Sequence, residues 1–138
     1  MIKKKHIRLY SKIVKLLSEE STCSREKVGA LLLKDTRIIA TGYNGSLPNH
    51  PHCIDVGCVI QDNHCISSIH AEQNVILFCA KHGISMKGCV LFTTHSPCEI
   101  CAKLLIQAGI SKVYYLKPYY LEENRFIKEL DCYEVKDG

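Results

Sequence analysis

The chain has 138 residues and a mass of 15.6 kDa, and 46% of its residues are hydrophobic, so we expect one domain over residues 1–138 and no second conventional domain. Charged residues make up 23% and the mean hydropathy is -0.02, which argues against a disordered chain and against a membrane-spanning one. The net charge of +4 favours an anionic partner, either a nucleotide phosphate or a nucleic-acid backbone, without choosing between them.

The first half of the chain predicts a helix, a strand pair and a loop. Apolar residues recur at helical spacing over residues 7–17, which predicts an amphipathic helix. Two short apolar runs, 28–33 and 37–41, are joined by a connection of hairpin length, so we expect the sheet to open with an antiparallel pair. Residues 42–68 show neither the helical nor the strand period and are predicted to form a long loop.

The second half alternates helices with strands. A helix is predicted over residues 70–81 with Gly83 as its stop, and a second helix has Pro97 at its first position and ends at Gly109. The remaining predicted elements are a strand at 89–94, a strand at 113–116, a helix at 122–130 and an edge strand at 132–135. This order predicts an α/β sandwich with a mixed sheet.

Two motifs at the starts of the predicted helices could hold a metal ion. His70-Ala71-Glu72 opens the first helix, and Pro97-Cys98-Glu99-Ile100-Cys101 opens the second. Cysteines three residues apart on a helix share a face, so Cys98 and Cys101 can bind one ion together with His70. The partial positive charge of helix N-termini favours the thiolates that zinc needs.

A spare carboxylate beside these ligands indicates catalysis. Structural zinc sites are closed by four protein ligands, whereas a catalytic site keeps a position for water, whose pKa the metal lowers to about 7. Glu72 could take that proton and deliver it to a substrate. Each part alone has a plainer interpretation: Cys98 and Cys101 as a zinc knuckle or redox pair, His70 as an ordinary histidine, and Glu72 as an acid that suits the helix dipole. Together they form the signature of zinc nucleobase deaminases.

The chain resembles the deoxycytidylate (dCMP) deaminases of the short bacterial and phage type, a group that includes a late-competence operon protein. The matching segments are residues 28–30, 42–46, 69–72 with Asn74 and Ile76, 96–101 and 107–110. The resemblance implies a three-layer α/β/α cytidine-deaminase-like fold with a mixed sheet of about five strands. It also implies zinc-dependent hydrolysis of dCMP to dUMP and ammonia for thymidylate synthesis, in homo-oligomers, often hexamers, that dCTP and dTTP regulate.

The resemblance further implies where the substrate binds. Asn44 would contact the sugar and pyrimidine, Arg25 the phosphate, and Tyr119 would lie beside the nucleotide. Backbone groups near Ala71 and Ser96 would hold the base. The plainer interpretations are that Asn44 only makes a turn, that Arg25 is a solvated surface charge and that Tyr119 packs against the sheet.

The same resemblance implies a second, structural zinc. Relatives bind it partly through residues that match Cys23, Cys53 and His64, and we choose Cys58 as the fourth ligand, with Cys65 as its competitor. The other interpretation is that these residues are scattered buried thiols and surface histidines.

Three positions depart from the family's pattern. Ser68 replaces a glutamate that some relatives use as a zinc ligand, so that ligand cannot carry over. Val75 stands where alanine is usual and adds bulk near the site without touching a ligand. Lys81 stands where some relatives carry an arginine tied to effector response, which leaves control by dCTP and dTTP open.

The nine cysteines and the lack of a signal peptide predict a reducing, cytoplasmic location with no membrane partner, and we expect no nucleic-acid substrate. The first rival is a tRNA adenosine deaminase, against which Asn44 and the cysteine-rich loop argue. A riboflavin-pathway deaminase would space its cysteines more widely than Cys98 and Cys101. The third rival, a non-catalytic zinc-binding accessory of DNA uptake, would have no need of Glu72.

Overall fold

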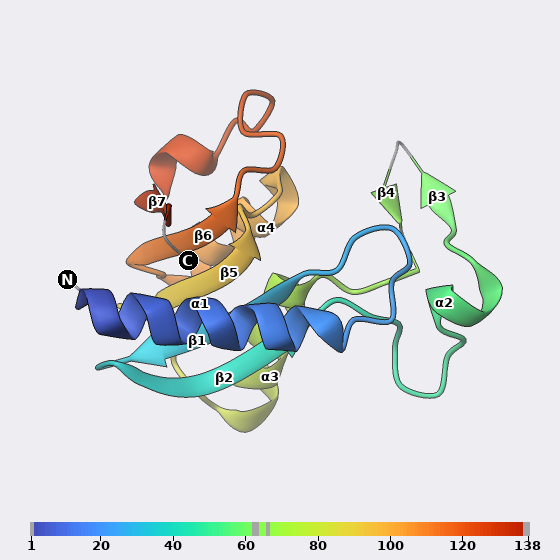
Figure 1. The fold of residues 1–138 in the computed structure, drawn as a ribbon, viewed down its shortest axis with the longest axis horizontal. Helices are drawn as coiled ribbons and strands as arrows, with labels where there is room; N and C mark the ends of the chain where they lie inside the picture. Colours follow the sequence, from blue (N-terminus) through green and yellow to red (C-terminus); the bar gives the residue numbers. More distant parts are fainter. Residues whose placement is uncertain (1, 62–63, 66, 137–138) are drawn as a thin grey trace.

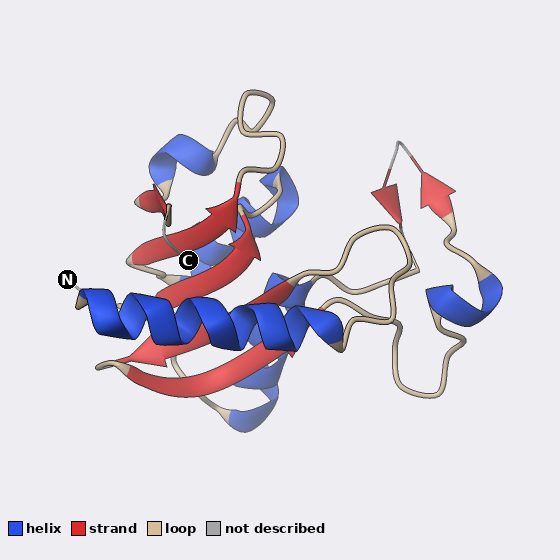
Figure 2. Cartoon of the chain, viewed as in Figure 1, coloured by secondary structure: helices blue, strands red, loops and turns tan. Residues whose placement is uncertain are grey.

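The computed structural model describes residues 2–61, 64–65 and 67–136, with the side chains of 64 and 65 outside the description. A five-stranded mixed sheet forms its centre, in the order β2-β1-β5-β6-β7 (Figures 1 and 2). The strands are β1 (Gly29–Lys34), β2 (Arg37–Tyr43), β5 (Val90–His95), β6 (Lys112–Lys117) and β7 (Cys132–Glu134). β1 runs antiparallel to β2 and β5, whereas β5, β6 and β7 are parallel. The expected opening pair, mixed sheet and edge strand are confirmed.

Helices cover both faces of this sheet. Successive side chains of β1 point to opposite faces, and the apolar side chains on each face are buried against a helix. Leu31 and Leu33 pack in one apolar cluster with residues of α1 (Lys4–Glu19). Ala30 and Leu32 pack in another with α3 (Ala71–His82) and α4 (Glu99–Ala108). Figure 1 shows α1 crossing in front of the sheet with α3 and α4 behind. The fold is therefore the expected three-layer α/β/α arrangement.

The sequence analysis predicted one long loop between β2 and α3, and this prediction is wrong for part of the stretch. It contains a short helix, α2 (Cys53–Val56), and a two-stranded sheet of β3 (Ile60–Gln61) and β4 (His64–Cys65). Elements of two to four residues are too short to produce a readable period, which is why pattern analysis missed them. In Figure 1 this segment lies to one side of the main sheet.

Two further predictions are wrong near the C-terminal half of the fold. The helix expected at 122–130 is only a 3-10 turn, Ile127–Glu129. The buried Asn124 side chain accepts hydrogen bonds from the backbone N–H groups of Phe126 and Ile127, which offers this segment an alternative to helix. Pro97 does not occupy the first position of α4, because Cys98 is the N-cap and Pro97 precedes it.

Close backbone packing sets the start of α3 against β2. A Cβ atom at Gly42 would lie 2.6 Å from the carbonyl oxygen of Ala71 and 3.1 Å from the Val75 side chain. Val75 is fully buried at this contact. α3 ends at Gly83 in the left-handed conformation (φ 67°), as the sequence predicted. None of the helices in the described ranges combines the length and the apolar character that crossing a bilayer requires.

Candidate metal centre and active-site pocket

Three of the expected ligands meet where two helices begin. His70 is the N-cap of α3 and Cys98 the N-cap of α4, while Cys101 lies in the first turn of α4 and is fully buried. The Nδ1 atom of His70 lies 3.5 Å from the Sγ atom of Cys98 and 3.3 Å from that of Cys101. Nitrogen and sulfur ligands of one tetrahedral zinc stand about 3.6 Å apart. The three side chains therefore fit a zinc ion.

The two thiols of this group affect each other's ionisation in opposite directions. The hydrogen bond from the Cys101 thiol lowers the pKa of Cys98 to about 4, and His70 adds to this, against the opposing effect of burial. The same hydrogen bond and burial raise the pKa of Cys101. A thiolate is therefore ready at neutral pH, and an approaching dication would remove the second proton as well.

Glu72 lies in the first turn of α3, two residues after His70, and is buried, with 4% of its surface exposed. Burial raises its pKa from 4.5 to about 7, and the charge of Cys98 adds to this, while a backbone hydrogen bond and His70 act in the opposite direction. A carboxyl group with a pKa near neutrality can both accept and donate a proton at the pH of a cell. A bound dication would lower this pKa again.

A cavity of about 180 Å³ opens beside the metal ligands. It brings together the residues that the sequence analysis gave to the substrate with Glu72 and two of the three candidate ligands, His70 and Cys98; the third, Cys101, is not among its described lining residues. Its lining consists of Cys23, Arg25, Glu26, Val28, Asn44, Ser68, His70, Ala71, Glu72, His95, Ser96, Cys98, Tyr119 and Tyr120. Several polar groups converge on this cavity, which is a common feature of sites for small ligands.

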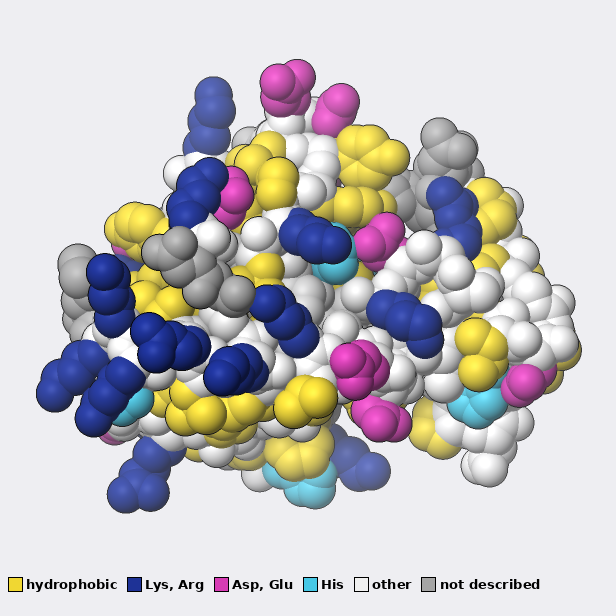
Figure 3. Space-filling view, viewed as in Figure 1, with side chains coloured by type: hydrophobic (Ala, Val, Ile, Leu, Met, Phe, Trp, Pro, Cys, Tyr) yellow, Lys and Arg dark blue, Asp and Glu magenta, His cyan; other side chains and the backbone are white. Residues whose placement is uncertain are grey.

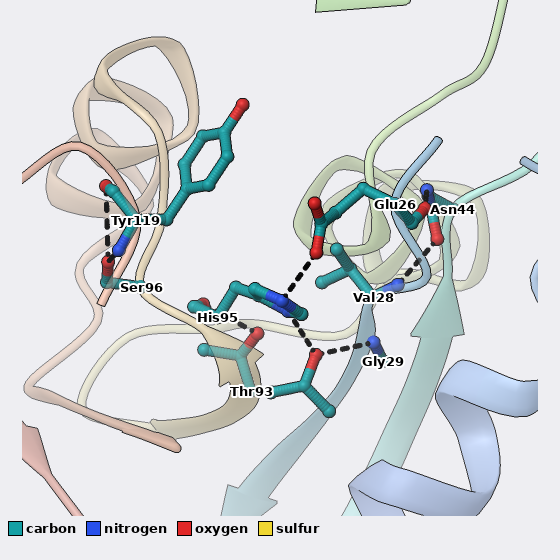
Figure 4. Close-up of polar contacts among 9 residues, drawn as sticks. Glu26, Val28, Gly29, Asn44, Thr93, His95, Ser96 and Tyr119 are labelled. Atoms are coloured by element: carbon teal, nitrogen blue, oxygen red, sulfur yellow. Dashed lines mark hydrogen bonds and ion pairs between the residues drawn. The ribbon is translucent and has the colours of Figure 1, made fainter. Parts of the chain in front are cut away.

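Asn44 is held on the cavity wall by its own amide group (Figure 4). Its Oδ1 atom accepts a hydrogen bond of 2.8 Å from the Val28 N–H, and its Nδ2 atom donates one of 2.6 Å to the Glu26 carbonyl. The side chain therefore connects the end of β2 to the segment before β1. It keeps one further donor and one further acceptor position for a ligand.

Ser96 and Tyr119 connect the ends of β5 and β6 on the opposite wall (Figure 4). The Ser96 hydroxyl accepts a 2.7 Å hydrogen bond from the Tyr119 N–H, and the Ser96 N–H donates to the Lys117 carbonyl. The backbone N–H of Ser96 is thus used within the fold. The Tyr119 ring stacks edge-on against Tyr120, with the ring centroids 4.6 Å apart.

Sequence reasoning missed Glu26 and His95 as cavity residues. The Nε2 atom of His95 lies 2.8 Å from a carboxylate oxygen of Glu26, and its Nδ1 atom lies 2.9 Å from the Thr94 hydroxyl (Figure 4). Burial lowers the pKa of His95, although Glu26 opposes this. His95 directly precedes the Ser96-Pro97-Cys98 segment, and that position was the available signal.

A second cysteine group adjoins the cavity. The Sγ atoms of Cys23, Cys53 and Cys58 lie within 4.8 Å of one another, and those of Cys23 and Cys58 are 4.0 Å apart. Sulfur ligands of one tetrahedral zinc stand about 3.8 Å apart. The expected participation of His64, and of Cys65 as a competitor, concerns side chains outside the described residues.

Comparisons with known proteins agree with this geometry. The model of the cytidine and deoxycytidylate deaminase zinc-binding region matches residues 3–117. The chain is 50% identical over 104 residues to ComE operon protein 2 of Bacillus subtilis (strain 168), a match that spans 75% of this chain and only about half, 55%, of that protein. It is 36% identical over 145 residues to the deoxycytidylate deaminase of Enterobacteria phage T2, covering 78% of this chain and 77% of the relative.

Among solved structures, the dCMP deaminase of cyanophage S-TIM5, in complex with dCMP and dUMP, matches with a TM-score of 0.86. It is 34% identical and covers 98% of this chain and 100% of its own. Both ligand motifs, His70-Ala71-Glu72 and Cys98 to Cys101, lie within the region that the family model matches. On this sequence match and this fold, the chain belongs to the cytidine and deoxycytidylate deaminase family.

Proposed function

We propose that this protein is a zinc-dependent dCMP deaminase that converts dCMP and water to dUMP and ammonia. The observation that carries the proposal is the buried Glu72, which shares one cavity with His70 and Cys98. The phage relatives named as deoxycytidylate deaminases, and the cyanophage enzyme with dCMP and dUMP bound, support dCMP as the substrate. The product dUMP would supply thymidylate synthesis.

In this reaction water adds to C4 of the pyrimidine ring, and ammonia leaves from the same carbon. His70, Cys98 and Cys101 would hold the zinc ion, which would supply a Lewis acid that lowers the pKa of water. Glu72 would take the proton from the attacking water, place it on ring N3 and then carry a proton to the leaving amine.

The opposite walls of the cavity would hold the nucleotide. Arg25 is exposed at the rim and would pair with the phosphate, while Asn44 would offer its remaining amide donor to the sugar. The Ala71 backbone and the Ser96 carbonyl would hold the base, and Tyr119 would lie against the nucleotide. Val28 supplies an apolar contact between these polar groups.

A substrate panel tests this proposal. The purified, zinc-loaded protein is assayed for ammonia release from dCMP, dCTP, deoxycytidine and a tRNA anticodon hairpin, with dCTP and dTTP also added as effectors of the dCMP reaction. We expect dCMP to react best. Reaction of the hairpin alone would establish the tRNA deaminase instead, and no reaction with zinc bound would favour the non-catalytic accessory protein.

We also propose that Cys23, Cys53 and Cys58 hold a second, structural zinc, with His64 as a further ligand. The distance of 4.0 Å between Cys23 and Cys58, close to that of two zinc-bound sulfurs, supports this. The backbone also supports it. Cys53 begins α2, and the N–H of the following residue, Ile54, donates a hydrogen bond to the carbonyl of Thr22, which directly precedes Cys23.

Metal content distinguishes this site from a chance group of thiols. Elemental analysis should give two zinc ions per wild-type chain and one for Cys58→Ser. Cys132→Ser is the matched control, because Cys132 is half-buried and lies outside both cysteine groups; it should keep two. One zinc ion in the wild type would remove the second site and leave the catalytic proposal intact.

We propose, finally, that the protein works as a homo-oligomer, with a hexamer as the family's common form. Large apolar side chains project from the two neighbouring helices of one face: Leu77 and Phe78 on α3 are 53% and 42% exposed, and Ile100 and Leu104 on α4 are 54% and 42% exposed. Such a patch is typical of an interface. Light scattering coupled to gel filtration should report more than one chain per particle, and Leu104→Glu should reduce that number.

A further inference from the structure

A second cavity, of about 360 Å³, lies on the side of the sheet that α1 covers. Four lysines from four separate segments line it: Lys15 of α1, Lys27 before β1, Lys117 at the end of β6 and Lys136 after β7. Figure 3 shows Lys and Arg side chains gathered over this face of the molecule. Because these lysines come from distant parts of the sequence, only the folded chain brings their charges together.

Among the described residues, 2–61, 64–65 and 67–136, none that lines this cavity carries a carboxylate. Lys136 has an exposed partner, Glu134, at 3.1 Å, and Lys27 donates a hydrogen bond to a backbone carbonyl. Within the part of the chain that the structure describes, neither Lys15 nor Lys117 has an ion pair. Four like charges around one cavity repel one another, and a multiply charged anion would relieve this repulsion.

The positive surface continues from this cavity along α1. Lys4, Arg8, Lys12 and Lys15 are exposed and recur at spacings of three or four residues, so they form one row on the helix. The helix contains a single acidic residue, Glu19. The row raises the local concentration of anions beside the cavity and thereby favours their entry.

The remaining lining indicates which part of an anion would be recognised. Lysine binds phosphate as a point charge and needs no fixed planar geometry. The apolar part of the wall is formed by Leu116 and Val135, and the lining residues that the structure describes include no Phe, Tyr or Trp ring on which a base could stack. The volume is near the lower end of ligand pockets, which span roughly 300–1,000 Å³.

We propose that this lysine pocket (Lys15, Lys27, Lys117 and Lys136) binds a free oligophosphate anion through its phosphates, without reading a base. Among the described residues, His95 alone lines both this pocket and the proposed active-site cavity, so the two sites adjoin but otherwise have different walls. An oligophosphate on the lysines would therefore contact none of the other residues proposed to hold the substrate. This inference does not depend on the proposed deaminase activity, because it concerns different charges and a different ligand.

Calorimetric titration tests the proposal. The probe is inorganic tripolyphosphate, added to the zinc-loaded protein in saturating dUMP, and zinc content is measured afterwards to show that the probe removed no metal. Lys15→Gln/Lys117→Gln removes two charges from the pocket. The matched control, Lys87→Gln/Lys103→Gln, removes two exposed charges outside the pocket, with Lys103 on a helix of the opposite face.

We expect tripolyphosphate to bind the wild type and the control equally, and the pocket variant at least tenfold more weakly. No binding to the wild type, or equal weakening of both variants, would overturn the proposal. A short single-stranded oligodeoxynucleotide is titrated in parallel. If it binds more tightly than tripolyphosphate and Arg8→Gln/Lys12→Gln weakens it, the surface is a nucleic-acid site and the free-ligand proposal is wrong.

Discussion

Replacing Asn44 by alanine should destabilise the fold, because the Asn44 amide group joins two segments of backbone. The substitution removes the 2.8 Å bond from the Val28 N–H and the 2.6 Å bond to the Glu26 carbonyl. A buried backbone group left without a partner costs about 1–3 kcal/mol. Val28 is half-buried, whereas Glu26 is exposed, so water can replace part of the second bond. We therefore expect the free energy of unfolding to fall by about 2–4 kcal/mol.

For a chain of this size, about 4 °C of Tm corresponds to each kcal/mol, so the Tm of Asn44→Ala should fall by roughly 8–16 °C. Urea denaturation of the zinc-loaded protein measures the free energy directly. The matched control is Asn74→Ala, which removes only an exposed 2.7 Å bond to the Tyr43 carbonyl and should cost about 1 kcal/mol or less.

The result that would refute this reasoning is an Asn44→Ala protein as stable as the wild type. If its KM for dCMP nevertheless rose, Asn44 would serve the substrate and not the backbone. Equal losses in Asn44→Ala and Asn74→Ala would also contradict the argument, because the structure gives the first side chain two bonds in a more buried place.

Three further predictions follow from the site. Glu72→Gln should keep its zinc and its fold but lower kcat for dCMP by about 10²–10⁴-fold in a spectrophotometric assay, and a smaller loss would exclude Glu72 as the proton carrier. Gly42→Ala should unfold at lower urea than the wild type, since the added Cβ atom would stand 2.6 Å from the Ala71 carbonyl; an unchanged midpoint would show that α3 can shift freely. Because burial lowers the pKa of His95 below its unfolded value of 6.5, against the opposing charge of Glu26, the unfolded chain takes up this proton first and stability should fall as the pH drops below 6.5. Unfolding at pH 7.5 and 5.5 should show a smaller difference for His95→Asn than for the wild type, and an equal or larger one would assign the loss to other groups.

The grouping of the candidate metal ligands could be predicted from the sequence, because few residue types bind zinc and their spacing on a helix is restricted. This is how His70, Cys98 and Cys101 could be selected from the sequence. The helix stop at Gly83 was predicted on a similar ground, because glycine is favoured in the left-handed conformation that ends a helix, and it is confirmed. Side chains that act through tertiary contacts leave no such pattern. The contact between His95 and Glu26 joins β5 to the segment before β1. These residues are far apart in the sequence, so no local spacing predicts that they meet.

The wrong predictions have the same origin. Asn124 ends up buried with its Nδ2 atom donating to the carbonyl of Pro97, far away in the sequence, and this contact competes with the helix that local propensity favoured. The cysteine-rich segment gave no readable period because its helix and strands are only two to four residues long, and its contact with Cys23, through Cys58, joins positions far apart in the sequence. The sequence indicated that these cysteines could bind a metal ion, but only the structure shows which of them lie close together.

His70 and Cys98 are the N-caps of α3 and α4, so a metal ion bound to them would affect local unfolding at the start of both helices. An ion bound to both would crosslink the first turns of two helices, so neither could fray without breaking a coordinate bond. Amide hydrogen exchange in these two turns should then slow together on metal loading, as a single cooperative unit. Removal of the metal would therefore increase local unfolding of these two helical turns beside the pocket before it affected the central sheet.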